Sequence, residues 1–218
     1  MIASPRPRYE NLILIVAPVS PRSPRYSRPD IAEARAKWQE GMTHLDPSKG
    51  IFIDVSGFDT KMTRRFGRSV CGKPCVGAVP HGHWRNNSFI AGLRCDRIDA
   101  AMLMEGAVNG DAFCAWIEQA LAPTLTQGDI VICDNLNVHK NARAKTAIQA
   151  RGAELRFLPA YSPDLNPIEM VFAKIKAIAR SAAARTFDAL CDAIKGAFDA
   201  INPQECLKYI RHPGYGPT

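Results

Sequence analysis

The sequence contains no apolar run long enough to cross a membrane. Its most concentrated run is NLILIVAPV at 11–19, whereas a membrane-spanning helix needs about 20 apolar residues. Arg6 and Arg8 ahead of this run loosely mimic a secretion signal, but the Pro/Arg-rich stretch that follows argues against one. We therefore expect a cytoplasmic protein with no membrane partner.

The sequence also lacks the closely spaced, even-numbered cysteines of a disulfide framework. It has seven cysteines, scattered through apolar segments, which is typical of reduced thiols in a cytosolic protein. One stretch, 71–83, reads C-x3-C-x5-H-x-H, and all four residue types can bind zinc. This spacing fits no common zinc module, so we do not expect zinc.

Acidic residues are fewer than basic ones. The 21 Asp and Glu face 28 Lys and Arg, which gives a net charge of +7 and a pI of about 9.2. Such a balance favours a polyanionic partner, although charge says nothing about the fold. With 46% hydrophobic residues the chain can still bury a sizeable core, so we expect a globular protein that binds nucleic acid.

The first 30 residues differ in composition from the rest. PRPRYE and SPRSPRYSRPD are rich in Pro, Arg and Ser, a composition that rarely buries a core. We expect residues 1–30 to form a flexible arm in which only Leu12–Val16 could add an edge strand or dock. Residues 31–218 then form one domain.

The remaining pattern predicts an α/β fold. Apolar, β-branched runs bounded by turn residues predict strands at 51–58, 73–83, 87–95, 98–106, 129–135 and 154–160. Helical periodicity and caps predict helices at 31–41, 109–125, 140–152, 167–180, 186–201 and 202–212. The first four strands indicate an antiparallel meander and the later units parallel crossovers, so we expect a mixed sheet flanked by helices.

Three carboxylates occupy notable places in this pattern. Asp54 lies inside the first apolar strand, Asp134 closes the strand DIVICDN, and Glu169 opens the helix that follows the last strand. Strands from neighbouring central positions would bring the three together, and their mutual repulsion would require a cation. Hard oxygen ligands suit Mg²⁺, and two such ions lie about 3.5–4 Å apart in sites that cut phosphodiesters.

Each carboxylate also has a purely structural explanation. Backbone amides could satisfy Asp54, and Asp134 with Asn135 could make an Asx turn. Glu169 could belong to a capping box, because Asn166 is a good N-cap and the helix would begin at the following proline. The joint placement of the three residues favours the metal site over these separate explanations.

Three stretches carry a family resemblance. IFIDVSGF at 51–58, ICDNLNVHK at 132–140 and FLPAYSPDLNPIE at 157–169 resemble the catalytic core of DDE transposases of the mariner-like superfamily. TKMTRRFG and AVPHGHW are similar to its bacterial insertion-sequence branch, and the 34 residues at 135–168 match the superfamily's spacing. The resemblance covers the chain from about Ile31 onward.

The resemblance implies a ribonuclease-H-like fold and metal-dependent DNA cleavage and strand transfer. Asp54, Asp134 and Glu169 would be the catalytic residues and the ligands of two Mg²⁺ or Mn²⁺ ions. Asn135 and Asn166 are possible supporting residues. The partners would be transposon-end and target DNA in the bacterial nucleoid, with a homodimer during transposition.

Basic residues flank each carboxylate and are the candidate DNA contacts, because cations near a cleavage site hold phosphates without reading sequence. They are Lys61, Arg64, Arg65, Arg68, His139, Lys140, Arg143, Lys145, Lys174, Lys176 and Arg180. For His139 the alternatives are a phosphate contact, a role in placing the attacking water, or a turn histidine satisfied within the fold. Solvated surface charge is the alternative explanation for the others.

Two features depart from the family pattern. Family members usually have glutamate directly after the first aspartate, where this chain has Val55. They also usually carry helix-turn-helix modules, where this chain has only the Pro/Arg-rich arm. We therefore expect a catalytic domain without the module that would recognise a specific DNA sequence. The alternatives are an inactive remnant that binds DNA or pairs with intact transposase and, less well supported, a host ribonuclease or resolvase.

Overall fold

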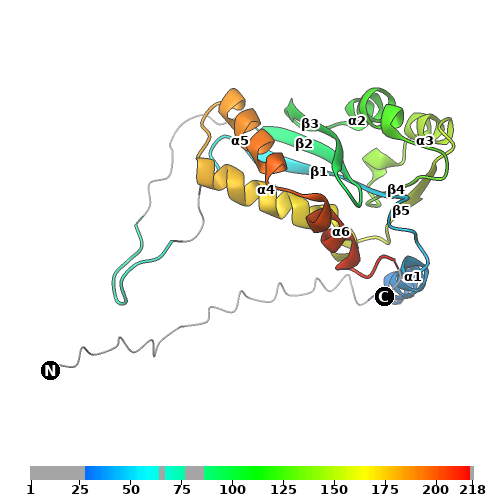
Figure 1. Ribbon diagram of the computed structural model, residues 1–218, viewed down its shortest axis with the longest axis horizontal. Coiled ribbons are helices and arrows are strands. Elements are labelled where there is room, and N and C mark those ends of the chain that lie inside the picture. The colour runs from blue at the N-terminus through cyan, green and yellow to red at the C-terminus, as the bar shows by residue number, and fades with distance from the viewer. Residues whose placement is uncertain (1–27, 64–66, 77–85, 217–218) are drawn as a thin grey trace.

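The computed structural model describes residues 28–63, 67–76 and 86–216, and shows a sheet with helices on both faces (Figure 1). Its five strands are β1 (Gly50–Asp59), β2 (Asn86–Leu93), β3 (Ile98–Glu105), β4 (Ile130–Cys133) and β5 (Glu154–Phe157). The six α-helices in these ranges are α1 (Pro29–Met42), α2 (Gly110–Trp116), α3 (Ala142–Gln149), α4 (Ile168–Ala182), α5 (Phe187–Asp199) and α6 (Pro203–Arg211). No described helix is both long and apolar enough to span a bilayer.

The strand order is β3-β2-β1-β4-β5, which places β1 at the centre of the sheet. β1 pairs antiparallel with β2 and parallel with β4, while β2–β3 is antiparallel and β4–β5 parallel. The parallel crossovers run through α2 and α3, since parallel strands need a long connection. The expected mixed sheet of a meander plus parallel strands is confirmed.

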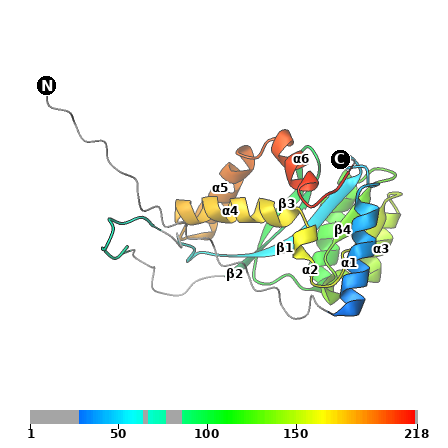
Figure 2. The same ribbon diagram turned by 90° about the horizontal axis from the view of Figure 1, so that it is seen from below.

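The two faces of the sheet have separate cores. Alternate residues of β1 point to opposite faces. Phe52 and Phe58 pack with α4, α5 and α6, whereas Ile51 and Ile53 pack with α2 and α3. Figures 1 and 2 show the long helix α4 crossing the sheet with α5 and α6 beside it, and α2 and α3 gathered elsewhere, near β4. Asp54 shares the face of Phe52 and therefore faces α4, while Val55 packs on the other face.

Several helix boundaries follow the predicted local chemistry. Asn109 caps α2 through the N–H of Ala112, and Gly152 follows α3 with a φ of 71°, a left-handed conformation that glycine adopts readily. After α2 the chain continues through a π-helical turn (η2, Ile117–Leu121) and a 3₁₀ turn (η3, Ala122–Thr124). The helix expected at 109–125 is thus present, but its second half is first π-helical and then 3₁₀-helical instead of α-helical.

Two expectations on chain organisation meet the structure only in part. The strand expected at 73–83 is wrong for 73–76, which are not in a strand, and 77–83 lie outside the described residues. Most of the arm expected at 1–30 also lies outside them. The first helix begins at Pro29, two residues before the start of the expected domain.

The end of the described chain is part of the core. Tyr215 is buried, its ring centroid lies 4.6 Å from that of Phe52, and its hydroxyl donates to the carbonyl of Leu165 at 2.9 Å. Trp38 on α1 donates in turn to the Tyr215 hydroxyl at 2.9 Å. These bonds join α1 and the chain end to the loop that leads into α4.

Candidate active site

Two aspartates meet at the centre of the sheet. β1 and β4 pair in parallel with Phe52 opposite Ile132, and continuing this register by two residues sets Asp54 beside Asp134. Both aspartates line one cavity of about 320 Å³, and residues 158–163 also line it. The prediction that they come from neighbouring central strands is confirmed.

Asp54 is a buried carboxylate with few compensating donors. It is 9% exposed and accepts from the N–H of Val55 at 2.7 Å and from Asn166 Nδ2 at 3.1 Å. Burial raises the pKa of Asp54 to about 7, and the bond from Val55 only partly offsets that rise. The charges of Asp134 and Glu169 lie close enough to raise this pKa further.

Asn166 does not cap α4 as predicted. Its side chain turns away from the helix and donates to Asp54 Oδ2 and, at 3.4 Å, to the carbonyl of Ile53. The position before the helix is held by Pro167, which makes no side-chain cap bond. Here a tertiary contact with β1 replaces the local capping interaction.

Asp134 is held by a buried histidine. His139 is 2% exposed, its Nδ1 bonds to Asp134 Oδ1, and its ring lies 4.4 Å from that of Phe113 between centroids. Asp134 also accepts from the N–H of Leu136 at 3.4 Å, so the Asx turn considered for it is present. In this conformation the ring of His139 is buried between Phe113 and Asp134, which favours the alternative of a histidine satisfied within the fold, while a phosphate contact stays a prediction.

Glu169 lies in the first turn of α4 with an exposed side chain. Its backbone N–H donates to the carbonyl of Asn166 at 3.2 Å, and within the described residues its carboxylate makes no hydrogen bond or ion pair. It lines a second cavity of about 280 Å³ that shares Asn166 with the first. The capping-box bond considered for Glu169 is thus not formed.

The donor set suits a hard divalent cation, although the ligands are not fully gathered. Within 28–63, 67–76 and 86–216, no three His, Cys, Asp or Glu side chains are arranged closely enough to enclose an ion by themselves. Asp54 and Asp134 nevertheless share one cavity, and neighbouring negative charge adds to the raised pKa of Asp54. The buried Oδ1 of Asn135, beside Asp134, has no partner in this part of the chain. Oxygen donors of this kind favour Mg²⁺ or Mn²⁺.

The predicted DNA-binding cations differ in their surroundings. Arg68, Lys140 and Lys145 are exposed, Arg143 is exposed and pairs with Glu118 at 3.1 Å, and Lys61 and Arg180 are half-buried. Lys176 lies 5.5 Å from the ring centroid of Phe58 on β1. Arg64 and Arg65 lie outside the described residues.

Lys174 is engaged within the protein. Its ammonium donates to both carboxylate oxygens of Glu205 at 2.7 and 2.8 Å and to the carbonyl of Ala200 at 2.6 Å. It therefore ties α4 to the start of α6. A phosphate that binds Lys174 would have to replace these three bonds, and a DNA contact by Lys174 stays a prediction.

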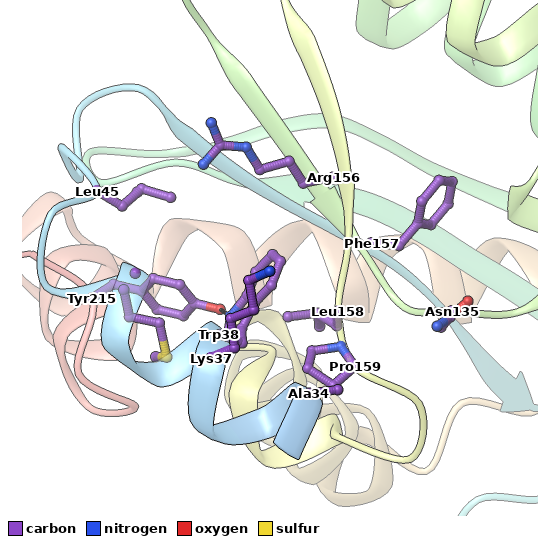
Figure 3. A pocket seen from close by; sticks show the side chains of 12 residues that line it. Ala34, Lys37, Trp38, Leu45, Asn135, Arg156, Phe157, Leu158, Pro159 and Tyr215 are labelled. Carbon is purple, nitrogen blue, oxygen red and sulfur yellow. Dashed lines mark hydrogen bonds between the residues drawn. The ribbon is translucent and has the colours of Figure 1, made fainter. Parts of the chain in front are cut away.

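A larger cavity of about 430 Å³ adjoins the carboxylates and shares Asn135, Leu158 and Pro159 with their cavity. Figure 3 shows Trp38 and Tyr215 together on one side of it and Asn135 on the other. Neither this cavity nor the stacking of Phe113 on His139 was anticipated. No local pattern signals contacts between segments so far apart in the chain.

Comparison with solved structures shows that this chain has the same fold as the catalytic domain of mariner transposases. The Mos1 mariner paired-end complex with Mn has a TM-score of 0.69 at 16% identity over 85% of this chain and 60% of that one. The Mos1 transposase catalytic domain with Raltegravir and Mg has a TM-score of 0.64 at 14% identity, over 85% of this chain and 91% of that one. This chain thus spans about 60% of the transposase in the end complex. No curated protein sequence matches it.

A match to a family model shows which protein family the chain belongs to, which the fold alone does not show. The model described as DDE superfamily endonuclease matches residues 49–191, from the start of β1 into α5. The matched stretch contains Asp54, Asp134 and Glu169 and covers more than half of the chain. With its ribonuclease-H-like sheet, the chain belongs to the DDE superfamily endonucleases.

Proposed function

We propose that this chain is the catalytic domain of a transposase of the bacterial insertion-sequence branch, and that it cleaves DNA and joins the freed 3′ end to target DNA with the aid of divalent metal. One observation carries the proposal. Asp54, on β1, and Asp134, directly after the parallel strand β4, line one cavity, and Glu169 opens the helix packed on the same face.

In this proposal Asp54 and Asp134 hold the metal from the sheet and Glu169 completes the set from α4. Bound Mg²⁺ or Mn²⁺ would supply Lewis-acid activation of the attacking hydroxyl and would neutralise charge at the phosphate. The residues of the chain fix the position of that chemistry: His139 and Leu136 hold Asp134, and Asn166 holds Asp54. No protein nucleophile is required.

The proposed partner is DNA, bound through its phosphates. Solved mariner complexes of this fold contain transposon ends, as their descriptions state. In this chain exposed Arg68, Lys140 and Lys145 are available for phosphates, and Lys140 directly follows the histidine that holds Asp134. A homodimer that pairs two DNA ends also belongs to the proposal.

Metal-dependent nicking of supercoiled plasmid DNA tests the proposed activity. We expect Asp134→Ala to lower the Mg²⁺-dependent nicking rate by more than about 100-fold, since even residues that only support a ligand typically contribute about 10–100-fold. Asp192→Ala on α5, an exposed aspartate outside the cavity, is the matched control and should cut at the wild-type rate. Equal nicking by Asp134→Ala would contradict the assignment.

A second function is favoured by the exposed position of Glu169 and the absence of a gathered three-ligand site among the described residues. In that case the chain is an inactive remnant that binds DNA or pairs with an intact transposase. DNA binding without nicking by the wild-type protein in Mg²⁺ or Mn²⁺ would support it.

Salt titration tests how DNA is bound. We expect similar affinity for two unrelated duplexes, with a slope in log K against log salt of about −0.9 for each phosphate neutralised. Lys140→Ala combined with Lys145→Ala should weaken binding to both duplexes alike and flatten the slope by about 0.9 for each phosphate that is no longer neutralised. Lys174→Ala is the control, because its ammonium is already bound to Glu205. A strong preference for one duplex at equal salt would show that the chain reads sequence.

A further inference from the structure

Asn166 is a buried asparagine whose side chain serves none of the local roles of its position. It is 2% exposed, lies between the 3₁₀ turn η5 (Pro163–Leu165) and α4, and its Nδ2 reaches 113 and 112 positions back to Ile53 and Asp54. A cap at this position would have bonded the first turn of α4 instead. The fold therefore gives up a local bond in order to place an amide against Asp54.

The orientation of this amide follows from its neighbours. Nδ2 faces two acceptors, the Asp54 carboxylate at 3.1 Å and the Ile53 carbonyl at 3.4 Å. Turning the amide over would set Oδ1 against both of these oxygens, which an ionised Asp54 does not tolerate. Asn166 thus donates to the carboxylate and fixes its rotation.

The other end of the amide is left without a bond. Oδ1 of Asn166 is buried and has no partner within the described part of the chain. Leaving a buried acceptor unpaired is unfavourable for the metal-free fold. Asn166 lines both the cavity of Asp54 and Asp134 and the cavity of Glu169, so this residue lies between the two halves of the candidate site.

The backbone of Asn166 bonds to the backbone of Glu169, the residue that carries the third carboxylate. Its carbonyl accepts from the N–H of Glu169 at 3.2 Å. One residue therefore bonds to Asp54 through its side chain and to the backbone of Glu169 through its main chain. A shift of the α4 entry relative to β1 would move Asn166 and Glu169 together and break the bond to Asp54.

We propose that Asn166 is a positioning residue that sets the Asp54 carboxylate and the start of α4 in mutual register for divalent-metal binding. This inference rests on the proposed function, because it assigns Asn166 a task in the same metal site. It differs from a purely structural role in one respect. Loss of the amide should weaken metal binding far more than it weakens the metal-free fold.

The test uses calorimetric titration of the full chain with Mn²⁺, together with thermal unfolding without metal. Asn166→Leu has similar volume and no donor, and Asn166→Ser is too short to reach Asp54. We expect both variants to bind Mn²⁺ about 10–100-fold more weakly, as is typical when a residue supporting a metal ligand is lost. Asn87→Leu on β2 is the matched control, since Asn87 is equally buried but lines neither of the two carboxylate cavities, and it should keep the wild-type affinity.

The outcomes separate the proposed role of Asn166 from the proposed function. Weakened Mn²⁺ binding by a folded Asn166→Ser, with unchanged binding by Asn87→Leu, supports the inference even if Asn166→Leu fails to fold. Wild-type affinity in a folded Asn166 variant overturns it and leaves the proposed function intact. If the wild-type protein itself binds no Mn²⁺, the proposed function fails, and the role of Asn166 fails with it.

Discussion

Replacing Asp54 with asparagine is expected to stabilise the metal-free protein by about 4 kcal/mol above pH 7 and to abolish the DNA cleavage that we propose. The pKa of Asp54 rises from 3.8 to about 7 because burial disfavours its charged form. A difference of that size corresponds to about 4 kcal/mol at about 1.36 kcal/mol per pKa unit. Asparagine has nearly the same shape and carries no charge, so it avoids this cost but is a poor substitute for a carboxylate ligand.

The pH range of the effect follows from linkage. Between pH 3.8 and about pH 7 the folded protein keeps a proton on Asp54 that the unfolded chain has released. The stability of the wild-type protein therefore falls as pH rises through this window, and the full cost is present above it. The advantage of Asp54→Asn should be near zero at about pH 4, grow up to about pH 7 and then remain level.

Urea unfolding in chelator at several pH values measures this difference, with exposed Asp192→Asn as the control. Adding Mg²⁺ should stabilise the wild-type protein, because a ligand that binds only the folded state adds RT ln(1 + [L]/Kd). It should not stabilise Asp54→Asn to the same extent. A pH-independent difference between the two proteins would show that Asp54 is ionised at little cost.

Replacing Arg94 with alanine is expected to lower the free energy of unfolding by about 3–5 kcal/mol, the cost typical of breaking a buried ion pair. Arg94, at the end of β2, is 5% exposed and bonds Asp99 at 2.5 Å, Asp129 at 3.0 Å and the carbonyl of Thr124 at 3.0 Å. Burial opposes ionisation of Asp129. Hydrogen bonds from Thr126 and Arg94 outweigh it, so the pKa of Asp129 is lowered. The variant leaves two buried carboxylates without their common partner.

Arg156→Ala is the matched control for this experiment. Its pair with Glu154 at 2.7 Å is solvent-exposed on both sides, and such pairs contribute about 0–1 kcal/mol. Chemical denaturation at neutral pH should therefore separate the two variants by several kcal/mol. A loss at Arg94 as small as that at Arg156 would mean that water replaces the guanidinium.

The sequence was most informative where a single segment determines the outcome. The apolar runs around Asp54 and Asp134 are typical of buried central strands. The sheet and the adjacent position of the two aspartates could therefore be predicted. Asn109 before α2 and Gly152 after α3 were likewise predictable, because caps act within one turn.

The sequence was least informative where a distant segment competes for a side chain. Asn166 has the residue type and position of a cap, but Asp54, 112 positions away, takes its amide. Lys174 lies on the polar face expected for a DNA contact, but Glu205 on α6 binds it. In both cases local chemistry was identified correctly and the partner was invisible in the sequence.

The contact between Tyr215 and Phe52 has a consequence for synthesis on the ribosome. Phe52 belongs to the central strand, yet the ring that covers it comes from one of the last residues of the chain. Contacts so distant in sequence form late in folding, after the intervening chain has collapsed. A nascent chain can therefore build the sheet early, but Phe52 is covered only after Tyr215 has left the exit tunnel. Translation stalled before that point would produce a domain in which Leu165, in the loop before α4, lacks its bond from the Tyr215 hydroxyl.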